Sequence, residues 1–295
     1  MPELPEVETT KTSLKPLLGQ KVAAVQVFQP KLRWQMPDDL NRLVGYRLHT
    51  VERRAKYLIA TFSTTDEITQ ALLTHQLIIH LGMSGSLQQH AYASEKRKHD
   101  HLLLIFQDAS GVQTQLHYHD PRRFGAVLWH QDYSAKLLNH LGPEPLSSAF
   151  STDYLYALIQ RSADIQQGSK KRPITKAIKS VIMEQQIVVG VGNIYATESL
   201  YLAGIHPATP ANQLTYEHID LLVQHIKVIL DKAIALGGST LRDFTVASGQ
   251  TGYFQQTLNV YGKQGQACPH CATTLENIKL NGRASVYCPS CQPLP

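Results

Sequence analysis

The four cysteines of this 295-residue chain all lie in its last tenth and form two equal pairs. Cys268 and Cys271 make the first Cys-x-x-Cys pair, Cys288 and Cys291 make the second, and sixteen residues separate the pairs. Thiolates at this spacing suit tetrahedral zinc, and two disulfides are the alternative, which a reducing compartment disfavours. Because four sulfurs close the coordination sphere and leave no position for a reactive water, we predict one structural Zn²⁺ with no part in catalysis.

A candidate nucleophile lies at the opposite end of the chain. Removal of Met1 would give Pro2 a free secondary amine beside the carboxylates of Glu3 and Glu6. The ordinary pKa of an α-amino group is about 8, so more of it is free base at neutral pH than of a lysine, and the carboxylates could carry protons. The alternative to a catalytic role is that these residues only begin a helix. Pro5 then suits the first turn, and the acidic side chains suit the positive N-terminal end of the helix dipole. The residues alone favour the helix start.

Composition limits the class of protein. The chain has 28 Lys and Arg against 23 Asp and Glu, and its formal net charge of +5 permits a polyanionic partner but is weak support by itself. Its length and its 43% hydrophobic content favour two compact units over one. The acidic, proline-rich start does not resemble a signal peptide, and no segment is long and apolar enough to span a bilayer. A soluble cytoplasmic protein is therefore expected.

The first half of the chain has the pattern of a β-rich domain behind one helix. The helix is expected to begin at Pro5 and to end near Gly19. Short β-rich runs follow over residues 21–29, 47–62, 77–89, 101–107 and 112–118. The segment Asp108-Ala-Ser-Gly111 joins the last two runs as a hairpin turn. We predict an N-terminal antiparallel β-sandwich with an N-terminal helix over residues 1–150.

The second half changes to helical spacing. Residues 162–173 contain a glycine and a basic run and are interpreted as a linker. Helices are predicted over 174–186 and 194–203, with a compact two-glycine turn between them, and over 214–236, whose apolar stripe is core. Residues 241–253 are expected to form a flexible loop. The predicted architecture is α+β and multidomain, with a helical helix-two-turn-helix domain over 151–254 and a C-terminal β-hairpin zinc finger over 255–295.

Several short motifs, in this order, resemble those of one known family. They are Pro2-Glu-Leu-Pro-Glu-Val-Glu8, Arg53-Arg-Ala-Lys-Tyr57, His80-Leu-Gly-Met-Ser-Gly-Ser86, Asp120-Pro-Arg-Arg-Phe-Gly125, Gly190-Val-Gly-Asn-Ile-Tyr195, Gly282-Arg283 and the paired cysteines. Over essentially its whole length the chain is similar to bacterial formamidopyrimidine-DNA glycosylase, an 8-oxoguanine glycosylase and AP lyase. A sibling family, the endonuclease VIII group, typically has Gly where Leu4 stands here, so the start favours the first family.

The resemblance implies a bifunctional enzyme of base excision repair that removes oxidised purines from damaged double-stranded DNA. Pro2 would attack the deoxyribose C1′ carbon, form a Schiff base in place of the damaged base, and allow β,δ-elimination of the phosphates. Glu3 would be the proton donor and Glu6 a supporting active-site group, while Lys56 would lie beside the lesion and its phosphate. Without the family, Glu3 and Glu6 are helix-capping carboxylates, and Lys56 belongs to a charged solvent face beside Arg53.

An enzyme that extracts a base must fill the gap left in the duplex, and the resemblance gives this task to Met83, Arg122 and Phe124. The turn-rich surroundings of Met83 and Phe124 suit exposed loops, although isolated residues of these types are more often core. Arg122 would face the orphaned cytosine, because a guanidinium can donate hydrogen bonds to base edges.

The resemblance also implies DNA contacts by His99, Asn193, Arg242 and Arg283. Asn193 lies at a helix N-terminus, where backbone N–H groups bind phosphate, and Arg283 lies on the zinc hairpin. By themselves, an N-cap asparagine and a surface arginine are common. Arg242 stands where similar proteins often have lysine, which keeps the charge but changes the hydrogen-bond geometry. The loop over 245–253 varies within the family, which leaves the ranking of lesions open, and the extra length near 63–75 is interpreted as a surface insertion.

Two other functions stay open on the sequence. A non-catalytic DNA-binding protein would use the same helix-turn-helix and zinc hairpin without a free proline amine, and a sibling enzyme would act on oxidised pyrimidines. His99, His101, His117 and His119 alternate in strand-like runs, for which a polar sheet face is favoured over a second metal site. We expect a monomer in the bacterial cytoplasm, associated with the nucleoid through DNA that it binds in a basic cleft between its domains.

Overall fold

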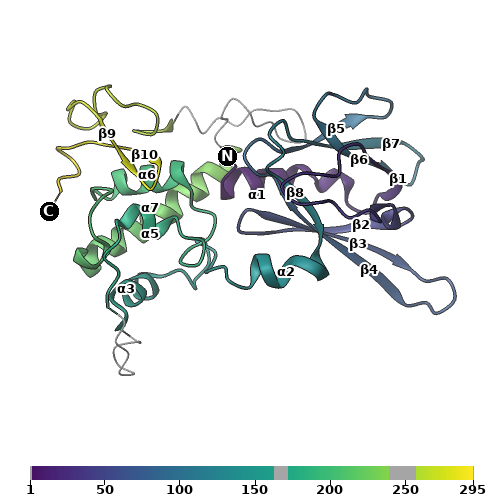
Figure 1. Ribbon diagram of the computed structural model, residues 1–295, viewed down its shortest axis with the longest axis horizontal. Coiled ribbons are helices and arrows are strands. Elements are labelled where there is room, and N and C mark those ends of the chain that lie inside the picture. Colours follow the sequence, from purple (N-terminus) through teal and green to yellow (C-terminus); the bar gives the residue numbers. More distant parts are fainter. Residues whose placement is uncertain (1, 163–171, 239–256, 295) are drawn as a thin grey trace. The chain divides into compact units, whose positions relative to one another are not determined.

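The computed structural model describes residues 2–162, 172–238 and 257–294 (Figure 1). The chain forms two compact units. Unit 1 comprises residues 1–139 and 236–255, and unit 2 comprises residues 140–235 and 256–295. The domain boundaries expected at 150 and 254 stay predictions.

Unit 1 begins with helix α1 (Leu4–Ser13), which has a proline in its first turn as predicted. The helix was expected to reach Gly19 but ends at Ser13. The short 3₁₀ turn η1 (Lys15–Leu17) follows, with Pro16 near its start. Proline has no backbone N–H and its ring disfavours a continued α-helix, which explains the early end.

Eight antiparallel strands form the sheet of unit 1 in the order β5-β7-β6-β1-β2-β3-β4-β8 (Figure 1). They are β1 (Lys21–Val27), β2 (Arg47–Arg54), β3 (Tyr57–Thr65), β4 (Leu72–His80), β5 (Ser86–Ala91), β6 (Asp100–Gln107), β7 (Gln113–His119) and β8 (Ala126–Trp129). Strands β1 and β2 share only the pair Lys21 and Arg47, so the sheet divides there into two four-stranded halves. One hydrophobic cluster takes side chains from both halves, for example Phe106 and Phe62. Two halves packed over one core confirm the predicted sandwich.

Two of the predicted β runs are hairpins or strand pairs rather than single strands. The run 47–62 is divided between β2 and β3 by a two-residue turn at Ala55 and Lys56. The run 77–89 is divided between β4 and β5 by a loop that contains Met83. The predicted hairpin turn after β6 is present, because the Asp108 N–H donates to the carbonyl of Val112. Strand β8 and helix α2 (His130–Leu138) were not predicted from the sequence. All four residues of β8 are buried, so this strand has no polar alternation to reveal it.

Unit 2 contains the predicted helical domain and zinc hairpin. Its elements are α3 (Thr152–Gln160), α5 (Ile178–Ile182), α6 (Asn193–Leu202), α7 (Tyr216–Ala235), β9 (Glu276–Leu280) and β10 (Arg283–Tyr287). Helix α5 is much shorter than the predicted helix 174–186, because the chain before it pairs in extended form, with Ala177 bridged to Pro210. The apolar stripe of α7 is buried, as predicted for core.

Parts of the sequence predictions fall outside the described residues. These are most of the linker 162–173 and the expected flexible loop over 241–253, which includes Arg242 and the variable segment 245–253. Within the described part of the chain, no helix is both long and apolar enough to cross a bilayer.

Candidate functional site

The start of α1 is built as a reciprocal cap of two carboxylates. The Glu6 side chain accepts the backbone N–H of Glu3 at 2.8 Å, and the Glu3 side chain accepts the backbone N–H of Glu6. Both side chains are only 2% exposed, and Pro2 before them is also buried. The helix-capping interpretation of Glu3 and Glu6 is therefore correct as geometry. The cap also holds the two carboxylates rigidly beside Pro2, which the sequence identifies as the candidate nucleophile.

Lys56 lies in the tight turn between β2 and β3, where Ala55 has a positive φ of 54°. A non-glycine residue in this conformation is strained, so its neighbours must hold it. Arg53 does so, because one of its guanidinium nitrogens donates to the Ala55 carbonyl at 3.1 Å. Its Nε donates to Glu8 of α1 at 2.7 Å. Arg53 thus belongs to an ion pair with the N-terminal helix and not to the solvent face considered for this run.

His80, at the end of β4, pairs across the sheet with Tyr57, which follows Lys56, and precedes the loop that carries Met83. Burial, followed by the positive charges of Lys56 and Arg33, lowers the pKa of His80 to about 4. Its Nδ1 accepts the backbone N–H of Gly82 at 3.1 Å. The ring is therefore neutral at physiological pH, and its acceptor nitrogen fixes the beginning of the Met83 loop.

Met83 and Phe124 lie on two separate loops of unit 1 and are 37% and 45% exposed. The Arg122 guanidinium lies 5.0 Å from the centre of the Phe124 ring. All three residues line one cavity of about 790 Å³, which Arg33 and His80 also line. The structure therefore brings together the three residues expected to act on the duplex, on exposed loops as their surroundings suggested. Their insertion into DNA stays a prediction.

The buried carboxylate of Asp120 joins these two loops. It accepts hydrogen bonds from the Ser84 hydroxyl at 2.7 Å and from the Gly125 N–H at 2.9 Å, one on each loop. The loops also touch directly, since a Cβ at Gly82, which has a φ of +65°, would lie 2.4 Å from the carbonyl carbon of Phe124. Only glycine fits there. From the sequence, Asp120 was only one residue of a motif, and its hydrogen bonds to both loops were not predicted.

The two histidines of β7 contact the buried carboxylate of Asp100 rather than forming a solvated polar face. His117 and His119 place Nδ1 at 2.8 Å from the two carboxylate oxygens of Asp100. Burial raises the pKa of Asp100, but hydrogen bonds from His119, Arg97 and His117 outweigh it and hold that pKa far below its usual range. The polar-face interpretation was therefore wrong for His117 and for His101 of β6, both of which are buried. The alternating pattern could not reveal this burial, because polar residues alternate in the same way whether they face solvent or a buried carboxylate.

His99 precedes this cluster, and its carbonyl accepts the backbone N–H of Asp120 at 3.0 Å. Its ring is half-buried and lies 5.8 Å from the ring of His119. His99 is thus attached to the loop that carries Arg122. Its expected contact with DNA stays a prediction.

In unit 2, Asn193 begins helix α6 directly after Gly192. The Oδ1 atom of Asn193 is buried and has no hydrogen-bond partner within the described part of the chain. Helix α6 is otherwise almost wholly buried, so its packing holds the position of its N-terminus.

Arg283 lies exposed at the start of β10, after a turn at Asn281 and Gly282 in which both residues have positive φ. Such an Asn-Gly turn is the strongest short sequence signal for a hairpin. Beneath the hairpin, buried Lys179 of α5 donates to the Ala284 carbonyl at 3.0 Å and to the Ser285 hydroxyl at 2.7 Å. Lys179 was not predicted as a functional residue, although a lysine within a short apolar helix was a visible signal.

Glu198 of α6 is a second missed residue of this unit. Its fully buried carboxylate accepts the backbone N–H groups of Asn259, Val260 and Tyr261 and the Asn259 side-chain amide, at 2.8 to 2.9 Å. These residues lead into the zinc hairpin. Helix α6 therefore holds the chain that enters the hairpin.

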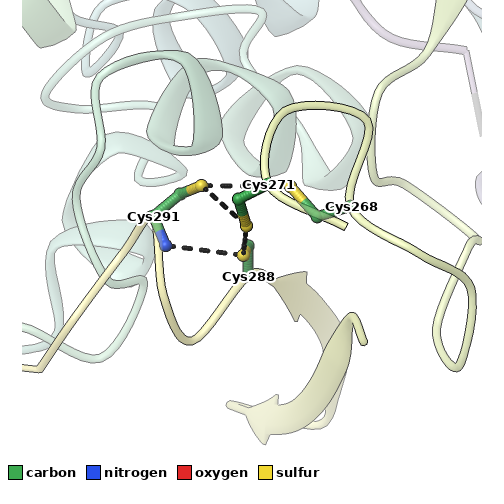
Figure 2. A group of neighbouring side chains, drawn as sticks. All are labelled: Cys268, Cys271, Cys288 and Cys291. Atoms are coloured by element: carbon green, nitrogen blue, oxygen red, sulfur yellow. Dashed lines mark hydrogen bonds between the residues drawn. The ribbon is translucent and has the colours of Figure 1, made fainter. Parts of the chain in front are cut away.

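The four cysteines meet at one point, as Figure 2 shows. Their sulfurs all lie within 4.8 Å of one another, with separations of 3.4 Å for Cys271 and Cys288 and 3.9 Å for Cys268 and Cys291. Tetrahedral Zn–S bonds of about 2.3 Å place sulfurs about 3.8 Å apart, whereas a disulfide needs about 2.05 Å. All four cysteines are free thiols, so the disulfide alternative is wrong and the residues fit one structural zinc ion. Burial raises the pKa of the Cys268 thiol, but hydrogen bonds from Tyr201 and the backbone lower it to about 6.

Comparisons with known proteins agree with this arrangement. Residues 1–127 match the formamidopyrimidine-DNA glycosylase N-terminal domain, residues 141–245 the formamidopyrimidine-DNA glycosylase H2TH domain, and residues 265–294 the zinc finger found in FPG and IleRS. The formamidopyrimidine-DNA glycosylase of Psychrobacter arcticus is 71% identical over 100% of this chain and 99% of its own length. That of Acinetobacter baylyi is 55% identical, with the same coverage.

A solved structure gives the same result for the fold. The crystal structure of a mutant Lactococcus lactis FPG in complex with a Fapy-dG containing DNA matches with a TM-score of 0.83 and 35% identity. The match covers 99% of this chain and 100% of that chain. The chain therefore belongs to the formamidopyrimidine-DNA glycosylase family.

Proposed function

We propose that this DNA glycosylase and AP lyase excises oxidised purines by means of the Pro2 amine and then cuts the strand by β,δ-elimination. The observation that carries the proposal is the reciprocal Glu3 and Glu6 cap, which holds two buried carboxylates next to buried Pro2. Family membership decides for an enzyme over a non-catalytic DNA-binding protein. The Fapy-dG ligand of the Lactococcus lactis protein supports a damaged purine as substrate.

The first chemical step needs Met1 to be removed. The Pro2 nitrogen attacks C1′ of the damaged nucleotide, and the bond from C1′ to the base breaks with its electron pair leaving on the base. The proton that the attacking amine loses neutralises the departing base. The C1′–O4′ bond then opens as Glu3 delivers a proton to O4′. The nitrogen lone pair forms the iminium, while Glu6 keeps the Glu3 backbone in place through its 2.8 Å hydrogen bond.

The same iminium supports strand cleavage. It acidifies the C2′ hydrogens, so loss of one C2′ proton expels the 3′ phosphate, and a second elimination expels the 5′ phosphate from C5′. Lys56, held by the strained turn at Ala55, supplies a positive charge for the phosphate of the lesion. One nucleophile thus accounts for both activities.

The remaining residues bind and deform the duplex. Met83, Arg122 and Phe124 enter the gap that the extruded base leaves, with Arg122 toward the orphaned cytosine. His99, Asn193, Arg242 and Arg283 contact the DNA, chiefly its phosphates. The zinc ion stabilises the hairpin that carries Arg283.

The test is a borohydride trap on zinc-loaded protein from which Met1 is shown by mass to be absent. The substrate is a duplex with 8-oxoguanine opposite cytosine, and matched duplexes carry guanine or thymine glycol at the same position. We expect a covalent adduct that maps to Pro2 with the first duplex and none with guanine. The variant Pro2→Gly, which keeps an amine, should still be trapped but more slowly.

Other outcomes have definite meanings. An adduct on a lysine would overturn the assignment of Pro2 while leaving the lyase chemistry. Trapping with thymine glycol but not with 8-oxoguanine would show a pyrimidine-specific sibling instead. No adduct with any lesion would refute the Schiff-base mechanism.

A further inference from the structure

Tyr201 reaches the zinc site from outside the zinc hairpin. It is the last buried residue of helix α6, and only 9% of it is exposed. Its ring packs in a small core with Val260, Leu275 and Val286, and its hydroxyl lies 3.3 Å from the Cys268 sulfur. Tyr201 is therefore placed to act on a zinc ligand without touching the metal.

The direction of this hydrogen bond follows from the state of the ligand. A cysteine that binds zinc is a thiolate and carries no proton to donate. The tyrosine hydroxyl keeps its proton at neutral pH, so it must be the donor and the Cys268 sulfur the acceptor. The contact is thus a charge-assisted hydrogen bond once the metal is bound.

The zinc site has a reason to need such a donor. Four thiolates around Zn²⁺ carry a net charge of −2, and Cys268 and Cys288 are 3% and 0% exposed. Buried negative charge is costly unless hydrogen bonds spread it. Side-chain hydroxyls reach two of the sulfurs, from Tyr201 to Cys268 and from Thr273 to Cys271 at 3.3 Å. Cys271 is exposed and open to water, whereas Cys268 is not, so the Tyr201 donor is the one that water cannot replace.

We propose that Tyr201 is a positioning residue of the zinc centre, whose hydroxyl stabilises the Cys268 thiolate and thereby slows the loss of zinc. Groups that hydrogen-bond metal ligands in this way commonly tune metal affinity. On α6, Glu198 precedes Tyr201 by three residues and so shares its face. Glu198 holds the chain entering the hairpin, and Tyr201 holds a zinc ligand within it. The helix that begins at Asn193 is thus attached to the metal centre at two points.

The experiment uses the full-length zinc protein and the variant Tyr201→Phe, which removes one oxygen atom. Zinc release into an excess of a chromophoric chelator should be about tenfold faster in the variant. In the cobalt-substituted proteins, the sulfur-to-cobalt charge-transfer band should move to lower energy in Tyr201→Phe. The reason is that loss of a hydrogen bond raises the energy of the sulfur lone pairs.

Two control variants isolate the effect. Tyr154→Phe removes a similar hydrogen bond in the same unit, from the Tyr154 hydroxyl to the Ile187 carbonyl at 2.9 Å, away from the metal. It should change neither the release rate nor the band. Thr273→Val removes the hydroxyl at exposed Cys271 and should have a smaller effect than Tyr201→Phe, because water can take its place.

A measurement on the unmodified sequence keeps the proposal testable if Tyr201→Phe does not fold. With a spin-half cadmium isotope in place of zinc, a hydrogen bond to Cys268 transmits a scalar coupling between the metal and the Tyr201 hydroxyl proton. Observation of that coupling supports the proposal. An observed hydroxyl proton without coupling overturns it, as does wild-type zinc release with an unshifted cobalt band in Tyr201→Phe. Equal acceleration in Tyr201→Phe and Tyr154→Phe, with no band shift, would mean general loosening of unit 2 and would also overturn it.

Discussion

Arg53 Nε lies 2.7 Å from the Glu8 carboxylate, and this ion pair joins the N-terminal helix to the hairpin that carries Lys56. The two partners are 45 residues apart in the sequence, and their side chains are only 11% and 18% exposed. Because Arg53 also holds the Ala55 carbonyl, a change at Glu8 reaches the turn beside Lys56.

Glu8→Gln should lower the free energy of unfolding by about 1–2 kcal/mol at neutral pH, since a largely buried charged hydrogen bond is weakened. Burial raises the pKa of Glu8, but the hydrogen bonds from Lys11 and Arg53 outweigh it and hold the pKa below the usual 4.5. The stabilisation is therefore complete above about pH 4.5 and is lost as the pH falls through the lower folded-state value.

Thermal melting of Glu8→Gln and wild type from pH 6 down to pH 3 checks this sign. The difference in Tm should shrink as the pH falls. The control Glu67→Gln changes an exposed glutamate of the same unit and should show little difference at any pH. A difference for Glu8→Gln that grows toward low pH would contradict the prediction.

Phe124→Ala should separate base extrusion from stability. The side chain is 45% exposed, so the free energy of unfolding should change by at most about 1 kcal/mol, including loss of the contact with Arg122. Excision of 8-oxoguanine should fall about tenfold or more, because the ring no longer offsets the unstacking of the duplex. Single-turnover kinetics measure the loss, and Leu72→Ala, a more exposed apolar residue of β4, is the matched control. Equal rates in the two variants would show that Phe124 does not enter the DNA.

His80→Asn tests the neutral histidine under the Met83 loop. Burial and the charges of Lys56 and Arg33 lower the pKa of His80 to about 4, from an ordinary 6.5. Because the unfolded chain takes up the proton first, the wild type should lose stability as the pH falls from about 6.5 to about 4. The variant keeps an acceptor for the Gly82 N–H. On acidification its free energy of unfolding should fall by about 1–3 kcal/mol less than that of the wild type.

Chemical denaturation at pH 7 and pH 4.5 measures this difference. The control His49→Asn changes an exposed histidine of β2 and should retain the pH dependence of the wild type. If His80→Asn lost as much stability as the wild type on acidification, His80 would not be the neutral group in the folded protein.

Glu198→Gln should destabilise unit 2 by about 2–4 kcal/mol, because the amide cannot accept hydrogen bonds from all of the N–H groups that face the carboxylate. Calorimetry of the zinc-loaded protein measures the change. The control Glu184→Gln breaks an exposed ion pair with Lys176 and should cost no more than about 0.5 kcal/mol. Similar costs for both variants would mean that the Glu198 contacts contribute little to stability.

The sequence by itself was sufficient for the elements and motifs that depend on local pattern. The spacing of the four cysteines predicted the zinc site, because two Cys-x-x-Cys pairs on one short hairpin bring four sulfurs together around one ion. The 3.6-residue stripe of α7 predicted its buried face. The ordered motifs were enough to identify the family.

Only the tertiary structure decided which polar residues are buried together. Asp120, Asp100, Lys179 and Glu198 are charged residues that each have a hydrogen-bond partner between 17 and 106 residues away in the sequence. No periodicity marks such a pairing, because the partners are chosen by strand order and helix packing rather than by local preference. The same holds for Tyr201, which is an ordinary core residue by pattern and becomes a neighbour of the metal only when α6 packs against the zinc hairpin.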